Sequence, residues 1–330
     1  VAVEARRAEI GVSFASRVGR GLHVMRMPGR SGAAREAVFV PDLPGVSGFP
    51  AFSSDGRHLY FSQYLNDTNR DGVIDGRDNS VIARVGFDAS RSDPFAGQAA
   101  EQLTSSRWNC HYPAPTDTRL LMTCSHGGSL DIYALPLDGV VPAAWDVERL
   151  RAELHVARDR WSQLLVASRL LAVLPDGSAR QGALQEVVAL HLDLREYESA
   201  NYYAERLVSH AGAESPMAAW AQLMDALARH RREDLALARG QLSRAYVESE
   251  QARLADVRAL CVPSTAAQPA APVQGAGPTM DDICALSTLV ASELLDDLGD
   301  KAEALAALQR VGRELVGRVR DPHTLRLHGA

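Results

Sequence analysis

The spacing of apolar residues changes once along this chain, between Pro142 and Asp146. Before Pro142, short runs of β-forming residues are separated by Pro, Gly, Asp and Ser, a pattern typical of strands joined by turns. After Asp146, apolar residues recur three and four positions apart, which is the spacing of one helix face. The sequence therefore predicts a multidomain protein in which an all-β part precedes an all-α part.

The length of 330 residues exceeds the usual size of one domain and agrees with this division. A stretch rich in Pro, Ala, Gly and Gln cannot bury an apolar face and is predicted to be a linker. The predicted parts are 1–142 (β), 146–261 (helical), 262–279 (linker) and 280–330 (C-terminal helical hairpin). The predicted helical segments are Asp146–Leu174, Ala179–Leu194, Glu196–His210, Ser215–His230, Glu233–Leu260, Met280–Leu298 and Lys301–Val319.

The composition excludes some classes of protein. The formal net charge is -6 and no long basic run occurs, so nucleic-acid binding is not expected. No apolar stretch is long enough to predict a transmembrane helix. The chain begins at Val1 without Met and without a basic segment followed by an apolar one, so we expect a mature or truncated product.

The twelve residues from Asp67 to Asp78 have an oxygen donor at each position that a calcium loop requires. Ca²⁺ is a hard ion that takes six to eight oxygens, and a loop of this length can wrap around it. Gly72 allows the sharp turn at position 6, and Ile74 at position 8 is expected to pack the loop onto the domain. The predicted ligands at positions 1, 3, 5, 7, 9 and 12 are Asp67, Asn69, Asp71, the carbonyl of Val73, Asp75 and Asp78.

This loop resembles those of EF-hand and dockerin proteins, with Asp78 in place of the EF-hand Glu, as in dockerins. Its flanks are strand-like, which predicts an insertion in a hairpin between Leu59–Tyr64 and Val81–Val85. A single loop of this kind favours a structural Ca²⁺ with a Kd of about 10⁻⁴ to 10⁻³ M. The alternative is a solvated acidic turn, because Asp, Asn and Gly are common in hairpin loops.

Four cysteines suggest two local disulfides. If Thr116–Thr118 is a hairpin turn, Cys110 and Cys124 lie at nearly equal distances on either side of it. Cys261 and Cys284 bracket the predicted linker and could close it. Disulfides imply an oxidising compartment. The alternative is four free, buried thiols.

Two segments of the β part share a pattern. Pro50-Ala-Phe-Ser-Ser-Asp-Gly aligns with Pro113-Ala-Pro-Thr-Asp-Thr, and each is followed by a strand. The pattern resembles the TolB-like β-propeller repeat, P-x-F-S-P-D-G-x-x-L-x-F, with Ser54 replacing Pro and Thr118 replacing Gly. The resemblance covers about residues 8–142 and implies a partial β-propeller of about three blades, fewer than the usual 4 to 8. We therefore expect the remaining blades on an upstream segment or a partner chain; the alternative is that the β part is an open fragment whose exposed edges a partner covers.

The helical part resembles tetratricopeptide repeats. Tyr197-Glu-Ser-Ala-Asn-Tyr-Tyr-Ala-Glu-Arg-Leu and Leu298-Gly-Asp-Lys-Ala-Glu-Ala-Leu-Ala-Ala-Leu match the small and large positions of that helix-turn-helix unit. The resemblance implies a concave surface that binds another protein. The alternative is a generic helical bundle, because Ala-rich helices produce similar patterns.

No catalytic motif accompanies these features, and the chain is predicted not to be an enzyme. We expect an extracytoplasmic scaffold or protein-interaction subunit of the cell envelope, located in the periplasm, associated with the outer membrane or secreted. One alternative is a propeller module that accompanies a hydrolase domain on another segment. Another is a surface protein that binds carbohydrate or peptide.

Overall fold

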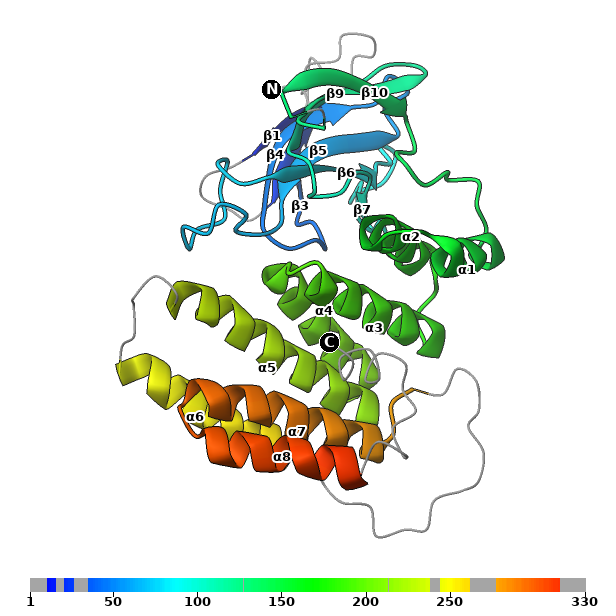
Figure 1. Cartoon of the computed structure of the whole chain (residues 1–330). Helices are drawn as coiled ribbons and strands as arrows, with labels where there is room; N and C mark the ends of the chain where they lie inside the picture. Colours follow the sequence, from blue (N-terminus) through cyan, green and yellow to red (C-terminus); the bar gives the residue numbers. More distant parts are fainter. Residues whose placement is uncertain are drawn as a thin grey trace. The chain divides into compact units, whose positions relative to one another are not determined.

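The computed structural model describes residues 11–15, 21–26, 35–126, 128–212, 214–237, 244–261 and 277–314. In these residues, ten strands precede eight helices (Figure 1). The predicted order of a β part followed by an α part is confirmed. The chain divides into two compact units, Val1–Leu174 and Pro175–Ala330.

The strands of the first unit form three antiparallel sheets, each made from strands that follow one another along the chain. The first sheet contains β1 (Gly11–Ala15), β2 (Leu22–Arg26) and β3 (Arg35–Phe39). The second contains β4 (Val46–Phe52), β5 (His58–Tyr64), β6 (Ser80–Gly86) and β7 (Glu101–Gln102). The third contains β8 (Cys110–Pro115), β9 (Arg119–Cys124) and β10 (Asp131–Pro136). Their assignment to a propeller stays a prediction.

The core of the β region lies around strands β5 and β6, which pair with each other over seven residues. All residues of the two strands except His58 and Gly86 are buried, and both strands contact β8 of the third sheet. Tyr60 is buried at the centre and donates a 3.1 Å hydrogen bond to the carbonyl of Leu137. The buried residues packed around it are Ile82, Leu103, Cys110, Leu120, Met122 and Cys124.

The first two helices, α1 (Val147–Val156) and α2 (Arg160–Val173), belong to the first compact unit. The prediction of one helical segment over Asp146–Leu174 was wrong, because the helix is interrupted at Ala157. Asp159 starts α2 by accepting a 3.0 Å hydrogen bond from the backbone N–H of Ser162. Such an N-cap satisfies a donor that a new helix leaves unpaired.

A buried ionic network fixes α2 to the second sheet. The Oε2 atom of Glu101 in β7 lies 3.0 Å from Nε of Arg84 and 2.7 Å from Nη1 of Arg169 in α2. Arg84 also lies 3.1 Å from Asp138. This network explains why the first unit extends to Leu174, whereas the sequence predicted an end at residue 142.

The second unit contains only helices among its described residues. These are α3 (Ser178–Asp193), α4 (Tyr197–Ala211), α5 (Pro216–Leu237), α6 (Arg244–Ala259), α7 (Met280–Asp297) and α8 (Lys301–Glu314). Helices α3, α4 and α5 pack in sequence, and α7 packs against α5, α6 and α8. Gly212 and Gly299 follow the ends of α4 and α7 with positive φ, a conformation that glycine adopts readily. The assignment to tetratricopeptide repeats stays a prediction.

The predicted break between the next two helices was also wrong. The sequence placed a break between His230 and Glu233, but α5 continues to Leu237. No helix-breaking residue lies there, and Arg231 is held by a 2.9 Å ion pair to Glu293 of α7.

Most of the predicted linker, residues 262–276, and the last predicted residues, 315–330, lie outside the described residues. Among the described helices, none is long and apolar enough to cross a membrane.

Candidate metal centre

The predicted calcium loop joins β5 to β6. Tyr64 pairs with Ser80 at the end of the ladder, so Asp67–Asp78 lies at the tip of a hairpin, as the sequence predicted. Ser80 ties the base of the loop to β8, because its Oγ donates a 2.6 Å hydrogen bond to the carbonyl of Cys110. The loop is therefore held on a rigid, buried part of the β region.

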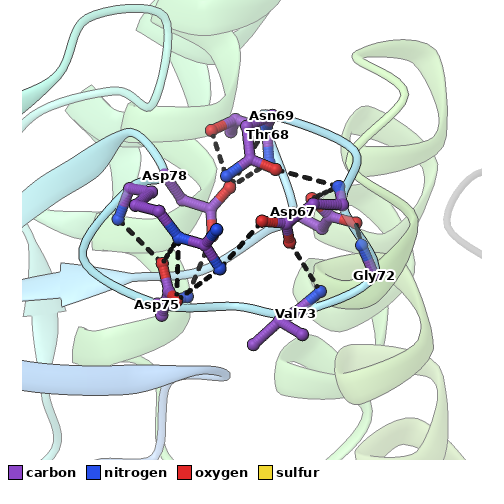
Figure 2. Close-up of polar contacts among 9 residues, drawn as sticks. Asp67, Thr68, Asn69, Gly72, Val73, Asp75 and Asp78 are labelled. Carbon is purple, nitrogen blue, oxygen red and sulfur yellow. Dashed lines mark hydrogen bonds and ion pairs between the residues drawn. The ribbon is translucent and has the colours of Figure 1, made fainter.

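The first three predicted ligands organise the loop's own backbone (Figure 2). Asp67 accepts hydrogen bonds of 3.0 Å and 2.7 Å from the N–H groups of Asp71 and Gly72. Asn69 Oδ1 accepts a 2.8 Å bond from the N–H of Asp71. Asp71 Oδ1 accepts a 3.0 Å bond from the N–H of Val73. Each acceptor oxygen keeps a further lone pair that could face a cation.

Gly72 has φ of +87°, which agrees with the sharp turn predicted at position 6. Arg70 also has positive φ, +62°, which is uncommon for a residue with a side chain. Two left-handed residues so close together bring the chain back on itself. Ile74, which was expected to pack the loop onto the domain, is half-buried.

Asp78, at position 12, is fully buried and closes the loop. Its Oδ1 accepts hydrogen bonds from the N–H and Oγ1 of Thr68, at 2.7 Å and 3.1 Å, and from the N–H of Asn69 at 3.1 Å. Its Oδ2 accepts one bond, 2.9 Å long, from the N–H of Asp75. Three donors saturate Oδ1, so only Oδ2 retains capacity for a metal.

Arg77 supplies a positive charge inside the loop. Its guanidinium lies 2.9 Å from Asp71 and 2.8 Å from Asp75, although 65% of the Arg77 side chain is exposed. Hydrogen bonds from the Arg77 side chain and backbone N–H lower the pKa of Asp75. Arg77 was not predicted to take part in the site, although a basic residue one position before the last predicted ligand is visible in the sequence.

The donor chemistry of the loop suits Ca²⁺, because the carboxylate, amide and carbonyl donors all present oxygen. The guanidinium shows that the carboxylates at positions 5 and 9 can gather around one cationic group. Among the residues that the structure describes, no three Asp, Glu, His or Cys side chains form a group that could hold a metal ion. To bind a metal ion, the carboxylates of Asp71 and Asp75 must give up their ion pairs with Arg77. Calcium binding stays a prediction.

Both predicted disulfides are present. Cys110 and Cys124 pair directly across β8 and β9, on either side of the turn that begins at Thr116. Cys261 and Cys284 join the residue that follows α6 to α7. Among the described residues no cysteine is free, so the alternative of four free thiols was wrong.

A second surface that could bind a ligand lies on the helical unit, in a groove of about 440 Å³ between α5, α7 and α8. We call it the α5/α7/α8 groove. Leu305 and Leu308 of α8 line it and are 57% and 44% exposed. Its apolar lining is Leu227, Leu286, Leu289, Val290, Ala304, Leu305 and Leu308.

Comparisons of the chain with protein-family models, curated proteins and solved structures give no match.

Proposed function

We propose that this protein is a non-catalytic, extracytoplasmic scaffold whose helical unit binds another protein and whose β unit is braced by Ca²⁺. The observation that carries the proposal is the α5/α7/α8 groove. Exposed leucines at positions 305 and 308 recur at the spacing of one helix face, and they line a hollow instead of lying singly on the surface.

The chemistry of the groove suits an amphipathic helix of a partner protein. Apolar side chains line its floor, and charged side chains that include Arg231, Glu293 and Lys301 stand among them. Arg231 and Glu293 pair with each other at 2.9 Å, so the charged groups there are ordered. A helix that places apolar residues three and four apart would bury the leucines and leave its polar face in water.

The proposed location outside the cytoplasm is supported by the two disulfides, because such bonds persist mainly in oxidising compartments. The proposed role of Ca²⁺ is structural. The ligands lie on one hairpin loop whose ends are fixed by the β5–β6 ladder, so binding would stabilise the loop by mass action.

A crosslinking experiment tests the protein-binding proposal. A photoreactive residue at Leu308 should crosslink to one defined partner in the native compartment, and the same residue at Ala306 should not. Ala306 is also exposed on α8 but does not line the groove. The variant Leu305→Asp with Leu308→Asp should lose the partner on purification, whereas Ala302→Asp with Ala306→Asp, which adds the same charge, should retain it. Equal retention by both variants, or hydrolase activity without a partner, would contradict the proposal.

A further inference from the structure

Two aromatic residues of the β unit share an uncommon backbone conformation at corresponding places in two sheets. Phe49 in β4 has φ of +50° and Tyr112 in β8 has φ of +57°. Each lies where its strand shifts register against the next strand, and each precedes a proline. The two residues therefore occupy equivalent bulges in consecutive sheets.

This conformation is unfavourable for both residues. A bulky side chain disfavours positive φ, and a following proline pushes the preceding residue toward extended backbone. Strained positions of this kind persist where the surrounding structure enforces them, and they cluster at functional sites. The same backbone strain occurs at two equivalent aromatic positions, so it is not a chance feature of a single loop.

The two rings meet at the surface. Their centroids are 4.5 Å apart and their planes are inclined by 67°, an edge-to-face arrangement. Phe49 is 45% exposed and Tyr112 is 52% exposed, so each ring offers part of its surface to solvent. At the residue before Phe49, a Cβ atom added to Gly48 would meet nothing within 4 Å apart from its chain neighbours, so the space at Gly48 is open.

The hydrogen bonds next to the two aromatic residues join polar groups that are uncharged. The N–H of Tyr112 donates a 3.2 Å hydrogen bond to Oγ of buried Ser62. Ser47 donates a 2.7 Å hydrogen bond to the side-chain carbonyl of Gln63. Burial is the one cause that lowers the pKa of neighbouring His111. A neutral ligand with hydroxyl groups suits these surroundings better than an ion.

The backbone at this place is poorly suited to an added peptide strand. Strands β4 and β8 are each at the edge of their sheet, but the bulges break the regular spacing of their hydrogen-bonding groups. Pro50 and Pro113 also have no N–H to donate. A ligand here would be held by the ring faces more than by the backbone.

We propose that Phe49, Tyr112 and the open space at Gly48 form a binding site for a neutral pyranose ring of a glycan. The C–H groups on one face of a pyranose pack against an aromatic ring, while its hydroxyls bond to uncharged polar groups such as the Tyr112 hydroxyl. This site lies on the β unit and does not rest on the α5/α7/α8 groove.

Calorimetric titration of the full chain with cellohexaose, maltohexaose and N-acetylated chitohexaose tests the site. At least one should bind with a Kd of about 1 mM or lower. Phe49→Gly and Tyr112→Gly should each weaken that binding tenfold or more. Because Gly tolerates positive φ, the melting temperature of these variants should stay unchanged or rise, whereas a purely structural aromatic pair would give a fall.

Gly48→Val provides a second variant that keeps both rings. It fills the open space at a residue without positive φ, so it should weaken glycan binding while the melting temperature changes little. Ile132→Ala, at a residue 80% exposed on β10, is the matched control and should bind as the wild type does. The proposal is overturned if no oligosaccharide binds, if a proline-rich peptide binds in their place, or if the glycine variants bind as tightly as the wild type.

Discussion

The buried carboxylate of Asp78 accepts a 2.7 Å hydrogen bond from the backbone N–H of Thr68, ten residues earlier in the chain. This contact and three others to the same carboxylate close the loop without any metal. Among the predicted ligands, Asp78 is the one whose side chain is fully buried, so its hydrogen bonds to the backbone are shielded from water.

Replacing Asp78 with Asn should destabilise the protein by about 1–3 kcal/mol, because an amide N–H₂ would face one of the backbone donors. The loss should already be present in EDTA and should be larger in Ca²⁺-containing buffer, where the variant also loses a ligand. Urea denaturation under both conditions measures it. Asp67→Asn is the comparison, and its effect should depend mainly on Ca²⁺. An Asp78→Asn variant as stable as wild type in EDTA would contradict this account.

Calcium should raise the melting temperature of the wild-type protein. With a Kd of 10⁻⁴ to 10⁻³ M, about 10 mM Ca²⁺ corresponds to about 1.4–2.7 kcal/mol of stabilisation. Asp67→Ala with Asp71→Ala should abolish the difference between Ca²⁺ and EDTA. Asp88→Ala, in another acidic turn, should preserve the difference. If Ca²⁺ leaves the wild-type melting curve unchanged, the prediction that the Asp67–Asp78 loop binds a structural Ca²⁺ is wrong.

Removing Arg77 should improve calcium binding. The guanidinium competes for Asp71 and Asp75, so Arg77→Gln should lower the Kd for Ca²⁺ by about two- to fivefold. Titration calorimetry at low ionic strength measures the change, with Arg57→Gln as a control outside the loop. Weaker binding by the Arg77→Gln variant would show that the guanidinium is not a competitor.

The ion pair between Arg77 and Asp75 also predicts how the stability of the fold depends on pH. Because hydrogen bonds from Arg77 lower the pKa of Asp75, this pairing stabilises the fold above the unfolded pKa of about 3.9 and is lost as pH falls through the lower folded value. NMR titration should find the Asp75 pKa closer to its ordinary value in Arg77→Gln. An unchanged Asp75 titration would mean that the pair does not persist in solution.

Loss of the Cys261–Cys284 disulfide should destabilise the helical unit. The cysteines are 23 residues apart, and closing a loop of this size contributes about 3 kcal/mol. In Cys261→Ser with Cys284→Ser, hydrogen exchange should accelerate in α6 and α7. Cys110→Ser with Cys124→Ser should accelerate exchange in β8 and β9. Peptide mapping without reduction checks both pairings, and crossed pairs would refute the assignment.

Glu101→Gln should be among the more destabilising single changes in the β unit. It leaves Arg84 and Arg169 buried beside a neutral amide, and breaking a buried pair costs about 3–5 kcal/mol. Thermal and urea unfolding measure the loss. Glu148→Gln, at an exposed ion pair on α1, should change stability by less than about 1 kcal/mol. Similar stabilities for the two variants would contradict the role of the network.

Local patterns in the sequence predicted several features correctly. The change in periodicity gave the order of β and α parts, and the turn after Pro115 placed Cys110 opposite Cys124. Gly72 gave the turn in the acidic loop. These predictions succeeded because they depend on residues close together in the chain, where spacing and backbone preference decide the outcome.

By itself, the sequence determined the order of the β and α parts, the approximate bounds of α3, α4 and α7, and which oxygen donors share one loop. Only the tertiary structure decided that Arg77 pairs with those donors, that Phe49 meets Tyr112 and that α2 is joined to β7 through Arg169 and Glu101. Contacts between distant residues follow from how apolar faces pack and which charges are buried together. Spacing along the chain does not encode that information.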